Sequence, residues 1–206
     1  MYLSTVNKTL IKIKKAKRGT LFFVENFVKI ANAKTVNKAL ERMVKTGELQ
    51  RLSKGIYYRP ANSKLIGELT PNIETVVLAI AKRDKARIAP TGSYALNRLG
   101  LSTQVPTNFV YLTDGSARKL TIGNSRITFK KTSPKNVAAV GAISSLVIQA
   151  LKTIGKDNVK INEIEHIQNI LKKEKYTRLE HDIRLAPAWI REIMLPILNQ
   201  LKNEQS

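Results

Sequence analysis

The sequence predicts an α+β protein with an N-terminal winged helix-turn-helix, followed by a mixed domain with a small antiparallel sheet and a helical C-terminal end. Three observations support this fold class. Residues 22–60 have the pattern of two short helices and a glycine-closed hairpin, short strand-like runs lie between residues 87 and 130, and helical periodicity dominates from residue 135. We expect a first domain at residues 1–60, a linker at 61–67 and a second domain at 68–206.

Two helices are expected to support a third in the first domain. Apolar residues at helical spacing predict a helix over residues 4–16, which Gly19 ends. A second, short helix is expected over residues 25–31. The residues expected in the core are Val6, Leu10 and Ile13 in the first helix, and Phe23, Phe27 and Ile30 in or just before the second.

The third helix is expected over residues 34–46. Asn32 is suited to begin it, because an asparagine side chain accepts hydrogen bonds from the first amides of a helix. Gly47 is suited to end it, because glycine tolerates the left-handed conformation of a C-terminal cap. Its apolar residues form one face toward the core: Val36, Leu40, Met43 and Val44.

The opposite face of this helix carries polar and basic residues, which are Thr35, Asn37, Lys38, Arg42 and Lys45. The start of the second helix of a helix-turn-helix enters the major groove, where amides and hydroxyls pair with base edges and cations pair with phosphates. Asn37 and Lys38 are therefore the predicted base readers. We expect the other three to help hold the DNA.

A hairpin is predicted after the third helix, with strands at residues 49–52 and 56–59 and Gly55 at the bend. It has the form of a wing. Its basic residues are Arg51, Lys54 and Arg59. We expect them to straddle the DNA backbone or to enter a narrow A·T-rich minor groove, which attracts arginine.

The charge of the chain favours a nucleic-acid partner. Its 36 Lys and Arg against 15 Asp and Glu give a formal net charge of +21, and residues 1–60 alone hold 14 basic and 3 acidic residues. Such a local excess is typical of a phosphate-binding surface. Two alternatives stay open: an anionic membrane surface bound through the amphipathic residues 9–17, or a small helical domain whose lysines contact only water.

The second domain is predicted to begin with a helix near Pro71. Strands are expected at residues 87–89, 109–112, 119–122 and 127–130, the last two joined by a tight turn at Gly123-Asn124, and helices at 137–153, 161–173, 176–185 and 188–201. Its candidate contact residues are Thr91, Arg98, Arg118, Lys119, Arg126, Lys130 and Lys131. They would extend the DNA contact, bind a nucleotide or RNA, or simply solvate the sheet.

Several classes of protein are excluded by composition. The absence of cysteine excludes disulfides and thiolate metal sites. Lysines interrupt the first apolar stretch, which argues against a signal peptide, and residues 137–151 are too short and too polar to cross a bilayer. We therefore expect a cytoplasmic protein without a membrane partner.

No enzymatic activity and no cofactor or metal are predicted. Gly92-Ser93 is similar to the start of a nucleotidyltransferase motif, but that chemistry needs paired carboxylates soon afterwards, and the first downstream acid is the lone Asp114. His166 and His181 each lie beside an acid on a predicted helix, where packing or surface roles are expected. Trp189 is expected to anchor a helix in the core or at an interface.

Residues 35–58, TVNKALERMVKTGELQRLSKGIYY, resemble the N-terminal winged helix of AbiEi-type antitoxins from bacterial type IV toxin-antitoxin pairs. Residues 90–101 and 108–115 are similar to later stretches of that family. The resemblance implies an autorepressor that binds inverted repeats in its own promoter, and a nucleotidyltransferase-like toxin as partner. Two copies on such a repeat would lie roughly 34 Å, or a multiple of it, apart. A stand-alone regulator and a toxin-binding module without operator specificity remain the alternatives.

Overall fold

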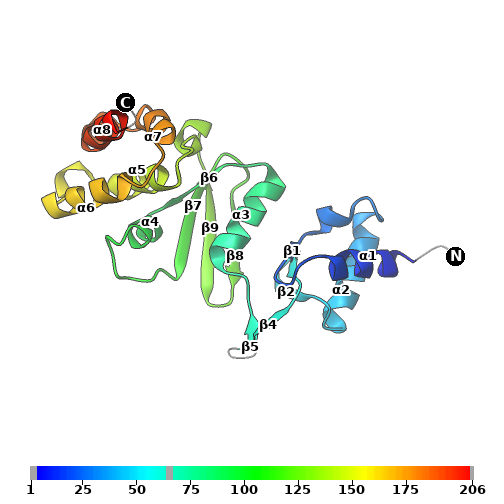
Figure 1. The fold of residues 1–206 in the computed structure, drawn as a ribbon. Helices are drawn as coiled ribbons and strands as arrows, with labels where there is room; N and C mark the ends of the chain where they lie inside the picture. Colours follow the sequence, from blue (N-terminus) through cyan, green and yellow to red (C-terminus); the bar gives the residue numbers. More distant parts are fainter. Residues whose placement is uncertain (1–3, 64–66, 205–206) are drawn as a thin grey trace. The chain divides into compact units, whose positions relative to one another are not determined.

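The computed structural model describes residues 4–63 and 67–204 (Figure 1). Contacts divide the chain into two compact units, residues 1–80 and 81–206, with the boundary inside helix α3, Ile73–Asp84. Both units contain helices and strands, so the chain is an α+β protein with small sheets. The sequence placed the boundary earlier, at residues 61–67.

Helix α1, Thr5–Lys15, opens the first unit as the sequence predicts. The Ser4 side chain accepts a hydrogen bond from the Asn7 amide at 3.2 Å and so caps the helix. Ile13 is fully buried, whereas the lysines of the helix are exposed. The helix therefore contributes an apolar side to the core and a basic side to solvent.

The second helix expected over residues 25–31 is wrong in type and extent. After a short strand β1, Leu21–Phe22, the chain forms a 3-10 helix η1, Val24–Phe27, and then continues as turns. The Asn26 side chain accepts a hydrogen bond from the Phe23 amide at 2.7 Å, which tightens the segment into one turn. Phe27 is fully buried, so the expected core role holds.

Helix α2, Ala33–Lys45, matches the predicted third helix. The Asn32 side chain accepts from the Thr35 amide at 3.0 Å, and Gly47 adopts φ +75°. Beyond the helix, the Glu48 amide donates to the Met43 carbonyl at 3.0 Å, as in a Schellman ending. Helix α2 shares a hydrophobic core with α1, η1 and the hairpin. It contributes Val36, Leu40 and Met43 to this core.

The predicted hairpin is present as β2, Gln50–Ser53, and β3, Ile56–Tyr58, with Gly55 at φ +75°. Strand β1 pairs antiparallel with the other edge of β3, giving the order β1-β3-β2. The sequence did not predict this third strand, which is two residues long. It joins the segment before η1 to the hairpin.

Part of the expected linker at 61–67 is regular structure. Strands β4, Ala61–Ser63, and β5, Gly67–Leu69, pair antiparallel, and residues 64–66 lie outside the described residues. Helix α3 follows, two residues after Pro71, with the Asn72 side chain accepting from the Thr75 amide at 2.8 Å. The expected helix is therefore confirmed, with Asn72 instead of Pro71 at its start.

The sheet of the second unit is mixed, which corrects the antiparallel prediction. Its strands are β6, Ile88–Thr91, β7, Asn108–Thr113, β8, Arg118–Ile122, and β9, Ser125–Lys131. The order is β6-β7-β9-β8, and β7 runs parallel to β9. The β8–β9 hairpin is antiparallel as predicted. However, its second strand, β9, and not its first strand, β8, pairs with β7, and β7 and β9 run in the same direction.

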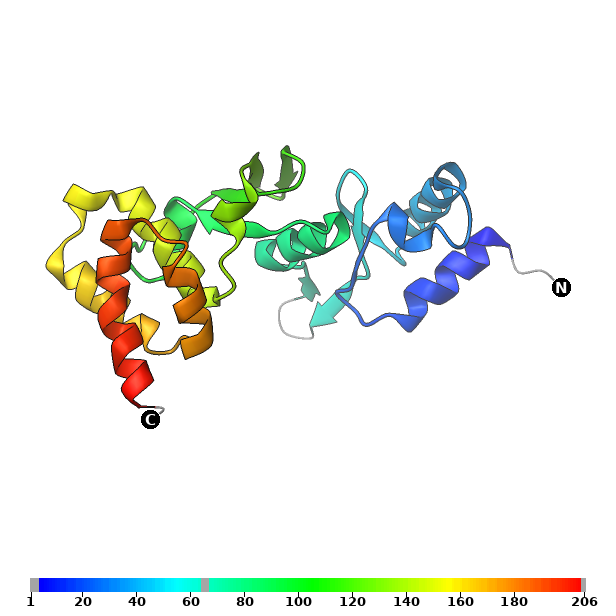
Figure 2. The ribbon, with the colours of Figure 1, turned by 90° about the horizontal axis from the view of Figure 1, so that it is seen from above.

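Helices dominate the rest of the second unit and gather beside its sheet (Figures 1 and 2). They are α4, Ser93–Arg98, η2, Pro134–Val137, α5, Ala142–Ile154, η3, Lys156–Asn158, α6, Ile161–Leu171, α7, Tyr176–Ile183, and α8, Ala188–Asn203. Helix α4 was not predicted. The helical C-terminal end is confirmed, and Trp189 packs partly buried against its core.

Candidate nucleic-acid interface

The polar face of α2 is open to solvent. All five residues predicted on it are exposed: Thr35, Asn37, Lys38, Arg42 and Lys45. Spacings of three, four and three residues place Thr35, Lys38, Arg42 and Lys45 in one stripe along the helix. These four line a single open hollow together with Val6 of α1. Asn37 lies outside this hollow. We call the four residues the α2 stripe.

The cations of the α2 stripe are unpaired among the described residues. Neither an ion pair nor a hydrogen bond joins Lys38, Arg42 or Lys45 to another described side chain, although Glu41 lines the same hollow. Lys14 of α1 differs, because its Nζ lies 3.0 Å from Glu48 Oε1. The α2 stripe therefore keeps a net positive charge, with three cations against the single carboxylate of Glu41 in the same hollow.

The hairpin presents two further cations. Lys54 is exposed at the bend, next to Gly55. Arg51 is exposed on β2, and its guanidinium carbon lies 6.0 Å from the centre of the Tyr57 ring, within the range of a cation–π contact. This contact steadies the guanidinium without supplying a counter-charge.

Arg59 makes contacts within the protein that the sequence did not predict. Its Nη1 donates to the Lys14 carbonyl at 2.8 Å and also to the Ala16 carbonyl. Carbonyls at the end of a helix lack partners within the helix, and a cation there also interacts favourably with the helix dipole. The guanidinium therefore joins the hairpin to the end of α1. The contact of Arg59 with DNA stays a prediction.

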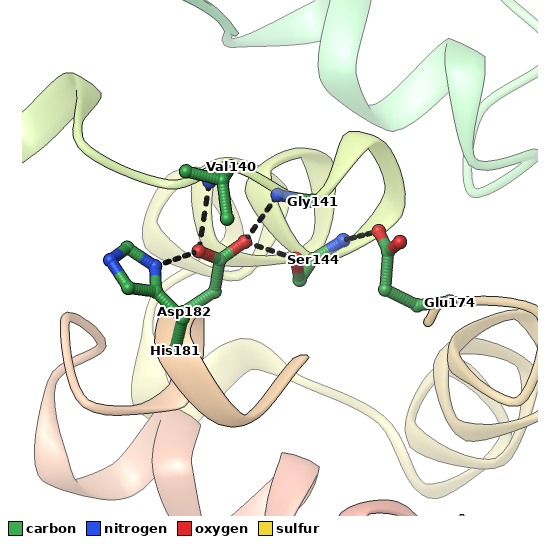
Figure 3. Close-up of polar contacts among 6 residues, drawn as sticks. All are labelled: Val140, Gly141, Ser144, Glu174, His181 and Asp182. Atoms are coloured by element: carbon green, nitrogen blue, oxygen red, sulfur yellow. Dashed lines mark hydrogen bonds and ion pairs between the residues drawn. The ribbon is translucent and has the colours of Figure 1, made fainter. Parts of the chain in front are cut away.

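A polar cluster in the second unit fixes the start of α5 (Figure 3). Asp182 of α7 is fully buried. One of its carboxylate oxygens accepts from the Val140 amide at 2.8 Å and lies 2.8 Å from His181 Nδ1. The other accepts from the Gly141 amide at 2.8 Å and from the Ser144 hydroxyl. This carboxylate holds the chain just before the first turn of the helix.

Glu174 completes the cap. Its Oε2 accepts from the amides of Ile143 at 2.7 Å and Ser144 at 3.2 Å. Two carboxylates at a helix N-terminus satisfy amides that have no partner within the helix. The periodicity of the sequence predicted that this helix begins at Val137. The two carboxylates explain why α5 begins at Ala142 instead.

The cluster contains Ser144, His181 and Asp182, but their arrangement does not suit nucleophilic catalysis. In a Ser-His-Asp triad the imidazole lies between the other two groups and takes the serine proton. Here the carboxylate lies in the middle, and Ser144 is fully buried. The geometry is that of a structural cap.

The other histidine also has a packing contact, since His166 Nε2 lies 2.7 Å from the Leu99 carbonyl oxygen. Within residues 4–63 and 67–204, no three His, Asp or Glu side chains come together as a metal site would require. No described helix has both the length and the apolar character needed to cross a bilayer.

Sequence reasoning missed the features that depend on distant partners. Arg59 contacts residues 45 and 43 positions earlier, and Asp182 contacts residues about 40 positions earlier. No local pattern marks such pairs. The basic face of α2 was found because the helix period alone separates it from the core.

Comparison with known proteins shows the family of the chain. No curated protein matches the chain. Residues 8–179 match DUF6088, described as a family of unknown function, and this match covers most of both units. The chain therefore belongs to the DUF6088 family.

Proposed function

We propose that this protein is a DNA-binding antitoxin of the AbiEi type that represses its own promoter through an N-terminal winged helix. The α2 stripe carries the proposal. Its three unpaired cations lie on one exposed side of a helix that is capped at both ends and packed on its other side. A rigid helix of this kind fits the major groove of duplex DNA.

The topology of the first unit supports the winged-helix assignment. The elements follow in the order α1, β1, η1, α2, β2 and β3, and the sheet order is β1-β3-β2. A winged helix needs a recognition helix followed directly by a hairpin, with a short first strand completing the sheet. Here η1 takes the place of the helix before the recognition helix.

The proposed division of roles follows from side-chain chemistry. Asn37 and Lys38 lie in the first half of α2 and are the proposed base readers, because their amide and ammonium groups match base edges. Arg42, Lys45 and Lys54 are the proposed phosphate contacts. Arg51, on strand β2 of the hairpin, is also a proposed phosphate contact.

The test of the proposal is binding of the full chain to the duplex upstream of its own gene, measured by fluorescence anisotropy at moderate salt. We expect the upstream duplex to bind at least tenfold more tightly than a scrambled duplex of equal length and composition. Equal affinity for the two duplexes would refute operator recognition.

The roles are separated by two variants. Asn37→Ala with Lys38→Ala is expected to reduce the ratio between upstream and scrambled affinity, because base contacts carry specificity. Lys54→Ala is expected to weaken both duplexes alike, since a phosphate contact does not read sequence. If both variants weakened the two duplexes equally, the assigned base readers would be wrong.

The antitoxin role rests on the resemblance of residues 35–58, 90–101 and 108–115 to the AbiEi-type family. Its test is growth of cells that express a nucleotidyltransferase-like neighbour gene with and without this chain. Rescue of growth would support the role, and co-purification would show direct contact. A chain that binds its operator but never rescues growth would instead be a stand-alone regulator.

A further inference from the structure

Glu41 is an acid within the basic surface proposed to bind DNA. Residues 1–60 contain three acids, Glu25, Glu41 and Glu48, and of these Glu41 is the one that lies on α2. It follows Lys38 by three residues and precedes Lys45 by four, so helix geometry places the three side chains on one face. All three line the same open hollow. A single negative charge thus lies among the cations of this hollow.

The Glu41 carboxylate is available to a ligand. The residue is exposed, and two lysines stand at the spacings at which helical side chains can pair. Even so, neither an ion pair nor a hydrogen bond joins the Glu41 side chain to any residue in 4–63 or 67–204. Glu48 differs, because its Oε1 lies 3.0 Å from Lys14 Nζ. The charge of Glu41 therefore faces whatever binds α2.

Such a carboxylate is compatible with few groups of duplex DNA. Phosphates repel it, and a carboxylate only accepts hydrogen bonds. In the major groove guanine offers the acceptors N7 and O6, and thymine offers the acceptor O4 beside a methyl group. A favourable contact thus needs a base with an amino group, which means cytosine or adenine.

Cytosine suits the carboxylate better than adenine does. The major-groove edge of cytosine presents the N4 amino donor alone, whereas adenine presents the N6 amino donor next to the N7 acceptor. A carboxylate oxygen placed against the N6 group of adenine would leave the other oxygen close to the N7 lone pair, which repels it. The cytosine edge has no such acceptor.

We propose that Glu41 is a specificity-determining residue, whose carboxylate accepts a hydrogen bond from N4 of a cytosine in the major groove. This role rests on the proposed operator recognition by α2. Base-reading side chains of one helix recur at spacings of three and four residues, and Glu41 lies four residues after Asn37 and three after Lys38. The same charge disfavours sequences without this cytosine, because it then faces only acceptors and phosphates.

The test measures the affinity of the full chain for the upstream duplex and for all its single-base-pair variants, in competition at moderate salt. At one base-pair position we expect the wild type to prefer cytosine over adenine by about tenfold. Glu41→Gln should prefer adenine at that position, because a glutamine amide pairs with both N6 and N7 of adenine. Glu41→Ala should have no preference there.

Glu25→Gln is the matched control. It removes an exposed acid of the same unit that lies outside the hollow, so the net charge changes equally. It should keep the wild-type preference at every position. The role of Glu41 would be overturned, with operator recognition intact, if Glu41→Gln kept the wild-type preferences or if Glu25→Gln changed them in the same way. A wild type that bound all the duplexes alike would overturn operator recognition and this role with it.

Discussion

At the residue scale, the partners of a basic side chain decide its role. Lys38, Arg42 and Lys45 are free of described partners, whereas Lys14 pairs with Glu48 and Arg59 binds carbonyls of α1. The sequence predicted the three free cations correctly as exposed, because helix periodicity fixes the face on which they lie. It did not predict the contacts of Arg59 with α1, since its partners are more than 40 residues away.

Arg59→Ala is expected to lower the free energy of unfolding by about 1–2 kcal/mol, because it removes charge-assisted hydrogen bonds to the end of α1. Urea unfolding measures this loss. Lys54→Ala, in the same hairpin but without such bonds, serves as the control and should leave stability nearly unchanged. If the two variants had the same free energy of unfolding, the hydrogen bonds between Arg59 and α1 would not contribute to stability, and the prediction would be wrong.

Gly141→Ala is expected to destabilise the second unit by about 1–3 kcal/mol. An added Cβ would lie 2.6 Å from Glu174 Oε2 and 2.9 Å from Asp182 Oδ2, too close for either carboxylate to keep its place. Thermal unfolding checks the prediction. Ala138→Gly, a change of similar size just before the cluster, is the comparison, and a wild-type melting temperature for Gly141→Ala would contradict the described cap.

At the element scale, local signals predicted the best-defined segments. Asn32, Gly47 and Gly55 mark the ends of α2 and the bend of the hairpin, and the structure places all three there. Apart from the segment of η1, where a local side-chain hydrogen bond forms a 3-10 turn, the failures involve non-local contacts. The β7–β9 pairing arises from the insertion of a hairpin, and the start of α5 is fixed by carboxylates from other segments, so neither has a signature within its own residues.

Asn32→Ala is expected to destabilise the first unit by about 1 kcal/mol, because the first turn of α2 loses its side-chain acceptor. Asn32→Ser should retain most of the stability, since serine also caps. The two variants are compared by urea unfolding monitored by circular dichroism. Equal stability of Asn32→Ala and Asn32→Ser would show that this cap does not hold the helix.

At the scale of the whole molecule, charge and topology support the same proposal. The sequence predicted an α+β chain with a helical C-terminal end, and its largest charge excess falls in residues 1–60, where the open face of α2 lies. Net charge alone draws any protein toward DNA, whereas a recognition surface binds through particular positions. The location of the cations therefore matters more than their number.

The most direct test of the DNA-binding role compares two triple variants of equal net charge on the upstream duplex, over a range of salt concentrations. One replaces Lys38, Arg42 and Lys45 with Gln, and the other replaces the exposed Lys156, Lys173 and Arg178 with Gln. We predict that the first loses affinity and that its log–log salt slope becomes shallower by about 2, as expected when the two phosphate contacts of Arg42 and Lys45 are lost. The second should bind like the wild type. Equal losses in both variants would contradict the account, because binding would then depend on total charge and not on α2.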